Sequence, residues 1–306
     1  MGELAAAQPG KNRRYVQLEP GPMEAELVDA RLGSVQVFRE RLGAGMFVEA
    51  APPSSLLPFG IILSAGGAIR FCGRDLRPTN VAQAAGGGWD IRFAGPIDYV
   101  SCVFQRAWFE REASALLGHA PRDDWFRNVG RPASSSAIGH LRTMITRTLE
   151  RMMHQPSLLA GERTRTAVEA ELVRLTVGAL TSAAEPTPVA AYGRRRRGVR
   201  RVIEYVTDHP DADTTAANLC GIAGVSERTL EYGFREYLDV TPVRFLKLVR
   251  LNRARRDLLR ASAQASAPPT TVTDVALRWG FFELGRFAGE YRRLFGERPS
   301  ETLRRP

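Results

Sequence analysis

The stretch TTAANLCGIAGVSERTLEYGFREYL, at residues 214–238, indicates the fold of the C-terminal part of the chain. Thr214 or Thr215 can cap a first helix, and Gly224 supplies a turn in which a Cβ would often crowd the backbone. Ser226 then suits the N-cap of a second helix, whose apolar residues recur at helical spacing. Two short helices joined by a tight glycine turn predict a helix-turn-helix unit.

The same arrangement recurs in TVTDVALRWGFFELGRFAGEYRRLF, at residues 271–295. Thr271 or Thr273 can cap a helix, and Gly280 follows as the turn. A second helix is then expected from about Glu283 to Phe295, with its aromatic residues facing inward. The sequence therefore predicts a second helix-turn-helix unit, loosely similar to the first.

A longer helix is predicted between the two units, in TPVRFLKLVRLNRARRDLLR at residues 241–260. Thr241 can cap it, and Pro242 fits its first helical position. A helix from Pro242 to about Leu259 is about 27 Å long, close to the ~34 Å that separates successive major-groove faces of one duplex. One subunit could therefore place two helices about one turn of the DNA duplex apart, which favours a bipartite, non-palindromic half-site.

The charge of the chain agrees with an acidic partner. The net charge is +10, and residues 190–306 hold 22 Lys+Arg against 14 Asp+Glu, so most of the excess lies in the C-terminal third. Such a balance indicates nucleic acid or an anionic surface. A chain of 306 residues with 44% hydrophobic and 25% charged residues is typical of a folded protein with two domains. No apolar run approaches the roughly 18 residues that a membrane-spanning helix needs.

The N-terminal half has a different pattern. Strand-length apolar or alternating runs separated by Gly and Pro occupy residues 24–105, and three stretches with helical periodicity follow within 106–183. We therefore expect an α+β protein, with an N-terminal β-sandwich or barrel, flanking dimerisation helices, and an all-α C-terminal domain. The expected boundaries are a flexible leader at 1–23, a sensor and dimerisation domain at 24–185, a basic linker at 186–198 and a DNA-binding domain at 199–306. Residues 261–270 are expected to be a flexible insertion.

The motifs of the C-terminal part resemble those of a known family. GVSERTLEYGFREYLDVTPVRFLKLVRLNRARRDLL at 224–259, followed by VTDVALRWGFFELGRFAGEYRRLFGERPSETL at 272–303, is similar to the double helix-turn-helix domain of the AraC/XylS family of bacterial transcription regulators. The likeness covers about residues 199–304. It implies DNA binding, recruitment of RNA polymerase and hence activation more often than repression, a homodimer, and a cupin-like sensor at the N-terminus.

The resemblance also implies which residues contact DNA. Arg can bind guanine O6 and N7 together, and Glu can accept a hydrogen bond from cytosine N4. For each Arg, the alternative is phosphate contact or plain solvation, and Arg235, Arg292 and Arg293 are expected to be phosphate partners. The candidates in the first recognition helix are Ser226, Glu227, Arg228, Thr229, Glu231, Tyr232 and Arg235. Those in the second are Glu283, Leu284, Gly285, Arg286, Gly289, Arg292 and Arg293.

Two departures from the family pattern affect this set. Leu284, Gly285 and Gly289 are poor hydrogen-bonding residues, so the second unit is expected to recognise DNA shape, pack on thymine methyls or grip the backbone. Asp239 stands where related sequences often have a left-handed Gly, so it is either strained or held by a local hydrogen bond. The run Arg194–Arg197 is either a solvated linker or an arm that contacts phosphates or the minor groove.

The N-terminal half offers little sign of catalysis. Its histidines lie outside the expected strands, and no set of His and Glu converges there to hold a metal, so no cofactor and no metal are expected. The three cysteines have no metal-site spacing. Cys72 and Cys102 are expected to be buried, with a redox sensor as the alternative. Phe71, Trp89 and Arg92 are candidates to line an effector pocket.

These observations favour a cytoplasmic, nucleoid-associated homodimer that binds promoter or operator DNA and responds to an unidentified effector or partner. RNA polymerase and a small molecule are the expected further partners, and the sequence does not identify the effector or the operator. Two alternatives stay open. One is a metal-dependent or metal-independent cupin-type enzyme with a DNA-binding tail, and the other is a protein that coats DNA without sequence preference.

Overall fold

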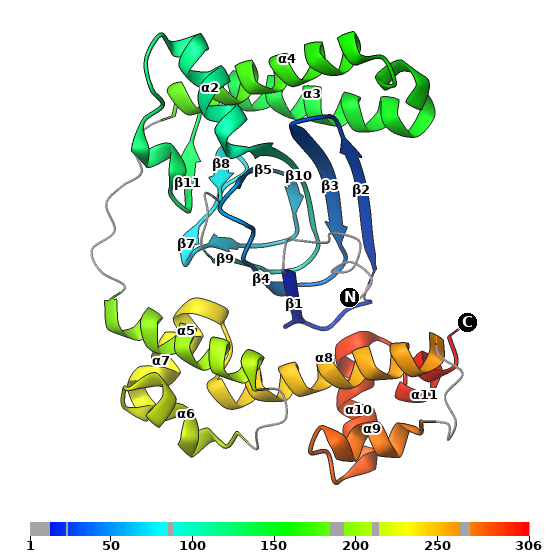
Figure 1. Cartoon of the computed structure of the whole chain (residues 1–306). Coiled ribbons are helices and arrows are strands. Elements are labelled where there is room, and N and C mark those ends of the chain that lie inside the picture. The colour runs from blue at the N-terminus through cyan, green and yellow to red at the C-terminus, as the bar shows by residue number, and fades with distance from the viewer. Residues whose placement is uncertain are drawn as a thin grey trace. The chain divides into compact units, whose positions relative to one another are not determined.

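Figure 1 shows a computed structural model of the chain, which describes residues 13–22, 24–84, 88–183, 193–209, 214–263 and 270–305. The chain divides into two compact units. One contains Glu24–Thr187, and the other contains Pro188–Pro306 together with the short segment Tyr15–Met23. Each unit is described by itself below.

The described N-terminal strands form two antiparallel sheets. The six-stranded sheet has the order β11 (Val129–Pro132), β8 (Asn80–Gln83), β5 (Leu56–Ala65), β10 (Ile97–Gln105), β3 (Val35–Leu42) and β2 (Ala25–Arg31). The five-stranded sheet has the order β1 (Arg13–Gln17), β4 (Met46–Ala50), β9 (Trp89–Phe93), β6 (Ile69–Phe71) and β7 (Arg74–Asp75). Short strands bounded by Gly and Pro form such a two-sheet fold because each sheet buries one apolar face.

The central strand of the larger sheet, β10, carries much of the core. It pairs with β3 on one side and β5 on the other, so that Cys102 lies opposite Val37 and Phe59. Its residues Val100, Cys102 and Phe104 are completely buried. Because their side chains alternate along the strand, all three lie on the face that packs against helices.

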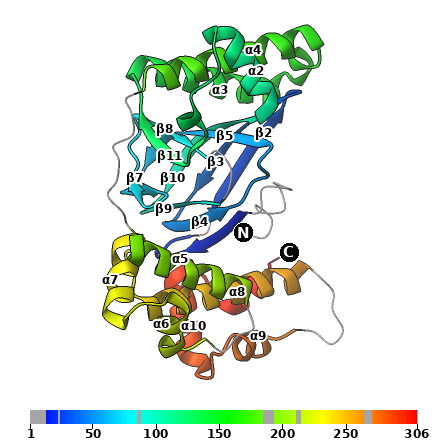
Figure 2. The same cartoon turned by 60° about the vertical axis from the view of Figure 1, so that its left-hand side comes forward.

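Three helices cover that face of the six-stranded sheet: α2 (Arg106–Leu117), α3 (Ser135–His154) and α4 (Glu162–Thr181) (Figures 1 and 2). Leu141 and Ile145 of α3 and Leu172 of α4 are buried in one core with the strands. Glu169 of α4 accepts hydrogen bonds from the backbone amides of Ser34 (2.5 Å) and Val35 (3.2 Å), which fastens α4 to the turn between β2 and β3. The apolar residues of α4 therefore pack against its own domain.

The expected α+β class, with two N-terminal β-sheets and a helical C-terminal part, is confirmed. Two local features differ from expectation. The predicted leader is structured from Arg13, where β1 begins, whereas residues 1–12 lie outside the described residues. Within the stretch expected to be only helical, residues 129–132 form β11, which pairs with β8. The sequence VGRP is too short for its periodicity to reveal a strand.

From Gly193 onward, every regular element that the structure describes in the C-terminal unit is a helix (Figure 2). Its helices are α5 (Gly193–Asp208), α6 (Ala216–Ala223), α7 (Glu227–Leu238), α8 (Pro242–Ala263), α9 (Val272–Arg278), α10 (Leu284–Phe295) and α11 (Pro299–Leu303). α8 passes between α6–α7 at one end and α9–α11 at the other. Among the helices described in either unit, none is long and apolar enough to cross a membrane.

Two helix boundaries differ from the sequence expectation. α5 begins at Gly193, so residues 193–198 of the predicted linker are helical; residues 186–192 lie outside the described residues. α8 has 22 residues, which corresponds to about 33 Å, because it continues through Ala263 rather than ending near Leu259. Residues 264–269 of the predicted insertion are outside the described residues as well.

Candidate nucleic-acid interface

The first helix-turn-helix unit consists of α6 and α7. The Thr215 hydroxyl caps α6, and Gly224 ends it with a φ of 66°, a left-handed conformation that favours glycine. The Ser226 hydroxyl then accepts a hydrogen bond from the Thr229 amide at 3.3 Å and caps α7. Phe234 of α7 is completely buried. These local devices fix the start of α7 and leave its first turn facing solvent.

The second unit, α9 and α10, has a different pattern of caps. Thr271 and Asp274 form a reciprocal capping box at the start of α9. Gly280 has a φ of 75° and turns the chain. Glu283 is the N-cap of α10, but its side chain makes no capping hydrogen bond. The predicted helix from about Glu283 to Phe295 is confirmed, with its inward aromatic residues Phe287 and Tyr291 buried.

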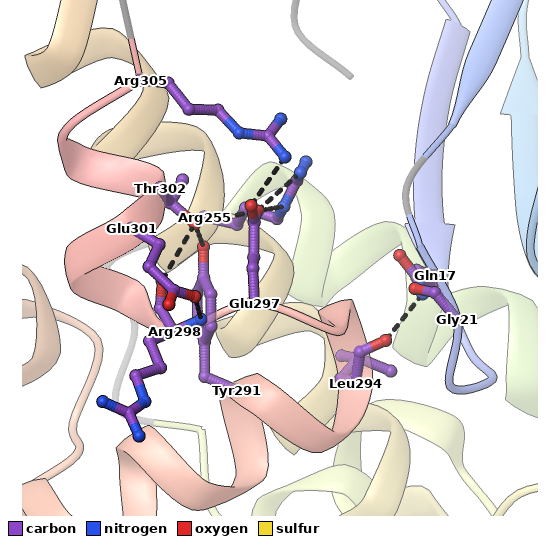
Figure 3. A network of polar contacts seen from close by, with 10 residues as sticks. All are labelled: Gln17, Gly21, Arg255, Tyr291, Leu294, Glu297, Arg298, Glu301, Thr302 and Arg305. Carbon is purple, nitrogen blue, oxygen red and sulfur yellow. Dashed lines mark hydrogen bonds and ion pairs between the residues drawn. The ribbon is translucent and has the colours of Figure 1, made fainter.

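The connecting helix α8 is anchored to the second unit by a buried ion pair. Arg255 of α8 donates two hydrogen bonds to Glu297, at 2.9 and 3.2 Å (Figure 3). Thr302 of α11 also donates to Glu297 and contacts the hydroxyl of Tyr291 at 2.8 Å. Burial raises the pKa of Tyr291, which keeps this hydroxyl neutral. Removing one member of such a pair would leave a buried charge without its partner, so the network holds α8, α10 and α11 in one arrangement.

The segment Tyr15–Met23 belongs to the same unit and contacts the end of α10. The side-chain amide of Gln17 and the backbone amide of Gly21 both donate to the carbonyl oxygen of Leu294, at 2.8 and 3.1 Å (Figure 3). Asn252 of α8 is hydrogen-bonded to the backbone of Gln17 in both directions. These bonds satisfy a carbonyl in the last turn of α10, where helices lack internal donors.

The structure places the predicted residues of the first recognition helix, α7, mainly on the surface. Arg228 is exposed, and its guanidinium lies 5.7 Å from the ring centre of Tyr232, which is 52% exposed. Arg235 forms an ion pair with Glu231 at 3.1 Å across one helical turn. Exposed members of the set are Ser226, Glu227, Arg228, Tyr232 and Arg235, while Thr229 and Glu231 are half-buried.

The predicted residues of the second recognition helix, α10, are exposed throughout. Arg286 contacts two acidic groups, Glu290 at 3.4 Å and Glu283 at 3.8 Å. Leu284 is 41% exposed. The full exposed set is Glu283, Leu284, Gly285, Arg286, Gly289, Arg292 and Arg293. These positions form a surface with few hydrogen-bonding side chains at its first turn.

The glycines of the two recognition helices differ in their surroundings. A Cβ placed on Gly233 of α7 would lie 2.9 Å from a side-chain carbon of Val199, so packing against α5 requires a small residue there. A Cβ placed on Gly285 or Gly289 of α10 would meet no atom within 4 Å. Glycine inside a helix is destabilising by roughly 0.5–1 kcal/mol relative to alanine. Nothing among the described residues of the unit therefore explains the two glycines of α10.

Sequence reasoning missed one charged residue on the second recognition helix, Glu290. Glu290 receives hydrogen bonds from Lys247 of α8 at 2.9 Å and from Arg286 at 3.4 Å. Burial alone would raise the pKa of this carboxyl, but the two cations lower it, so Glu290 stays ionised near neutral pH. The spacing of Arg286 and Glu290, four residues apart, was the available sequence signal. The contact with Lys247 has no such signal because it joins two helices.

Asp239 and the basic run at residues 194–197 were the other two positions that the sequence left open. Asp239 adopts the left-handed conformation with a φ of 59°, and its amide donates to the carbonyl of Arg235 at 3.0 Å, which ends α7. Of the basic run Arg194–Arg197, Arg195 forms an ion pair with Glu236 at 3.4 Å, and the Arg196 guanidinium lies 5.9 Å from the ring centre of Tyr237. These contacts attach the start of α5 to α7.

The N-terminal unit buries the other residues that the sequence singled out. Cys72 and Cys102 are buried, and burial raises the pKa of the Cys102 thiol to about 12. Phe71, Trp89 and Arg92 are buried too. Among the described residues, His, Cys, Asp and Glu side chains form no group of three that could hold a metal ion.

The comparisons with known proteins concern the C-terminal unit. A family model described as a helix-turn-helix domain matches residues 219–305. The chain is 45% identical over 106 residues to a probable thc operon regulatory protein of Rhodococcus erythropolis, which covers 35% of this chain and 31% of that protein. It is 35% identical over 105 residues to the XylDLEGF operon transcriptional activator 3 of Pseudomonas putida, which covers 34% of this chain and 30% of that one.

A solved structure of a probable AraC family transcriptional regulator from Rhodopseudomonas palustris is 41% identical, covering 36% of this chain and 98% of that chain, with a TM-score of 0.32. The chain spans about three tenths of the length of the two curated relatives, and each match covers about a third of this chain. The C-terminal domain of the chain is a helix-turn-helix domain that is similar to those of AraC/XylS-family transcriptional regulators.

Proposed function

We propose that this protein is a transcription regulator that binds promoter or operator DNA at a specific sequence. The observation that carries the proposal is the pair of recognition helices, α7 and α10, held at the two ends of one connecting helix with their first turns exposed. A major groove admits one helix and displays a full pattern of donors and acceptors. The excess of basic residues in 190–306 supports binding to the phosphate backbone.

The two helices would divide one half-site between them. We assign base contacts in the first segment to Arg228 and its exposed neighbours on α7. In the second segment, α10 approaches closely through Gly285 and Gly289, with Arg286 at the edge. Arg235, Arg292 and Arg293 are exposed and are assigned to phosphates, which fix the position of the protein without distinguishing sequences. Because α8 is about 33 Å long, the two base-contacting segments lie about one helical turn apart.

The wider assignment is that of a nucleoid-associated homodimer that activates transcription through contacts with RNA polymerase. It is supported by the relatives in Pseudomonas putida, whose names are those of operon activators. The N-terminal unit is assigned to dimerisation and to sensing an effector or partner.

No catalytic role is proposed, because the relatives that the chain matches are regulators. The alternative of a cupin-type metalloenzyme with a DNA-binding tail has a direct test. Metal analysis of the purified full-length protein would support that alternative if it found stoichiometric iron or zinc.

The experiment that tests the proposed function is selection of bound duplexes from a random DNA pool, followed by affinity measurements across salt concentrations. We expect a bipartite consensus, resistance to competitor DNA, and a steep loss of affinity as salt increases. Equal affinity for the selected and the random duplexes would contradict the proposal and would favour a protein that coats DNA without sequence preference.

A further inference from the structure

A cleft of about 430 Å³ lies between the two helix-turn-helix units. Its walls come from both of them: the residues just before α6 on one side, and the loop before α10 with the first turns of α10 on the other. The first half of α8 forms the floor. The residues that line it include Thr214, Lys247, Arg250, Phe282, Arg286 and Glu290. The cleft therefore adjoins the first turn of the second recognition helix.

The cleft is lined by three cations, Lys247, Arg250 and Arg286, and on its α10 side by two acidic residues, Glu283 and Glu290, which both contact Arg286. Lys247 and Arg250 stand one turn apart on α8, and Arg250 donates to the carbonyl of Thr214 at 3.2 Å. Glu290 holds Lys247 and Arg286 toward each other, at 2.9 and 3.4 Å from its Oε1 atom. The cations are thereby ordered before any partner arrives, which reduces the entropy lost on binding.

Large apolar side chains also line the cleft. Phe282 is 80% exposed and Val243 is 56% exposed. Phe282 has the highest exposed fraction among the large apolar residues that the structure describes. Exposed apolar surface bordered by polar residues marks an interaction site. Its neighbours here are the cations of α8 and the recognition helix itself.

We propose that this cleft seats the sugar–phosphate backbone of one DNA strand between the two base-contacting segments, with Lys247 and Arg250 facing phosphates and Phe282 and Val243 against the intervening deoxyribose. The inference rests on the proposed function. The backbone of DNA combines anionic phosphates with less polar sugars, and the cleft is lined by both cations and apolar side chains. When α10 occupies a major groove, DNA is also the partner adjacent to its first turn.

The test uses the full-length protein and a duplex selected from random DNA. Lys247→Ala should weaken binding about five- to tenfold and lower the slope of log K against log salt by roughly 1, because one phosphate contact is lost. Phe282→Ala should weaken binding about threefold without changing that slope. Arg260→Ala, an exposed cation on the same helix outside the cleft, and Leu277→Ala, an exposed apolar residue on α9, are the matched controls and should leave both quantities unchanged.

A second measurement alters the DNA and compares the parent protein with Lys247→Ala. Methylphosphonates, which remove the charge of single phosphates, are placed one at a time along the stretch between the two base-contacting segments. The parent protein should lose affinity at one or two of these positions, and Lys247→Ala should be insensitive there. The same loss for parent and variant would overturn the proposal.

The outcomes separate this inference from the proposed function. If the parent selects no sequence, the proposed function fails. If the parent is specific but Lys247→Ala and Phe282→Ala behave like their controls, only the cleft assignment fails. Loss of transcriptional activation by these variants at unchanged DNA affinity would overturn it in favour of a protein partner in the cleft.

Discussion

The two recognition helices, α7 and α10, have similar buried faces and different exposed faces. Each has 12 residues, and each ends at a left-handed residue, Asp239 or Gly296. The outer face of α7 carries hydrogen-bonding side chains such as Arg228, whereas the corresponding part of α10 carries Gly285 and Gly289. Under the proposed function, this difference predicts that α7 distinguishes bases through side chains, while α10 fits closely against DNA and is sensitive to its shape.

The largest expected effect distinguishes the arginines of the two helices. Arg228→Ala should cost about 1–3 kcal/mol at one base pair and relax the preference there, because a bidentate contact to guanine is lost. Arg286→Ala should weaken binding to all sequences by similar, smaller amounts, since Glu290 and Glu283 already compete for this guanidinium. The measurement is affinity for a set of duplexes with single base changes. If Arg228→Ala keeps the preferences of the parent, the assignment of α7 is wrong.

The second prediction concerns close approach at α10. Gly289→Ala should raise the free energy of unfolding by about 0.5–1 kcal/mol, because alanine favours a helix and the added Cβ meets nothing in the protein. The same change should weaken DNA binding by about 1 kcal/mol, a packing penalty of the size seen when extra methyl groups are forced into contact. Thermal unfolding and DNA titration of one sample give both values.

Gly233→Ala in α7 is the matched control. Its Cβ would lie 2.9 Å from Val199, so this variant should be destabilised. Gain of stability without loss of DNA affinity in Gly289→Ala would show that α10 does not approach DNA closely at this position.

The third prediction compares the two N-caps. Ser226→Ala should destabilise the unit by about 1 kcal/mol, because the Thr229 amide loses its acceptor. Glu283→Ser should stabilise it by about 0.5 kcal/mol, since the present N-cap makes no side-chain bond to α10. Urea unfolding of the full-length variants measures both. An unchanged midpoint for Ser226→Ala would contradict the role given to this cap.

The smallest effect is expected at the end of α7. Asp239→Gly should stabilise the unit by about 0.5 kcal/mol, because a non-glycine residue with a φ of 59° is strained and a local bond to the Arg235 carbonyl needs only the backbone. DNA affinity should not change. A loss of stability would mean that the Asp239 side chain makes a contribution larger than the strain.

The amino-acid sequence predicted the features that depend on residues close to one another in the chain. The caps at Ser226 and Thr271, the glycine turns at Gly224 and Gly280, and the start of α8 at Pro242 follow from local chemistry and are present as expected. The recognition helices could be located for the same reason.

Contacts between distant segments could not be predicted in this way. The pair formed by Lys247 and Glu290 joins residues 43 apart, and the bond between Gln17 and Leu294 joins residues 277 apart. Neither leaves a periodic signal in the sequence. The cleft between the two helix-turn-helix units depends on how the helices of the C-terminal unit pack. The neighbours of Phe282 in the sequence therefore could not reveal that its side chain is exposed.

The central claim is that α7 and α10 enter two major-groove segments of one half-site. Methylation interference on a selected duplex tests it most directly. We predict two groups of purines whose N7 methylation blocks binding, centred about one helical turn apart on the same face of the DNA for each protomer. A single group per protomer, or no position of interference, would contradict the account.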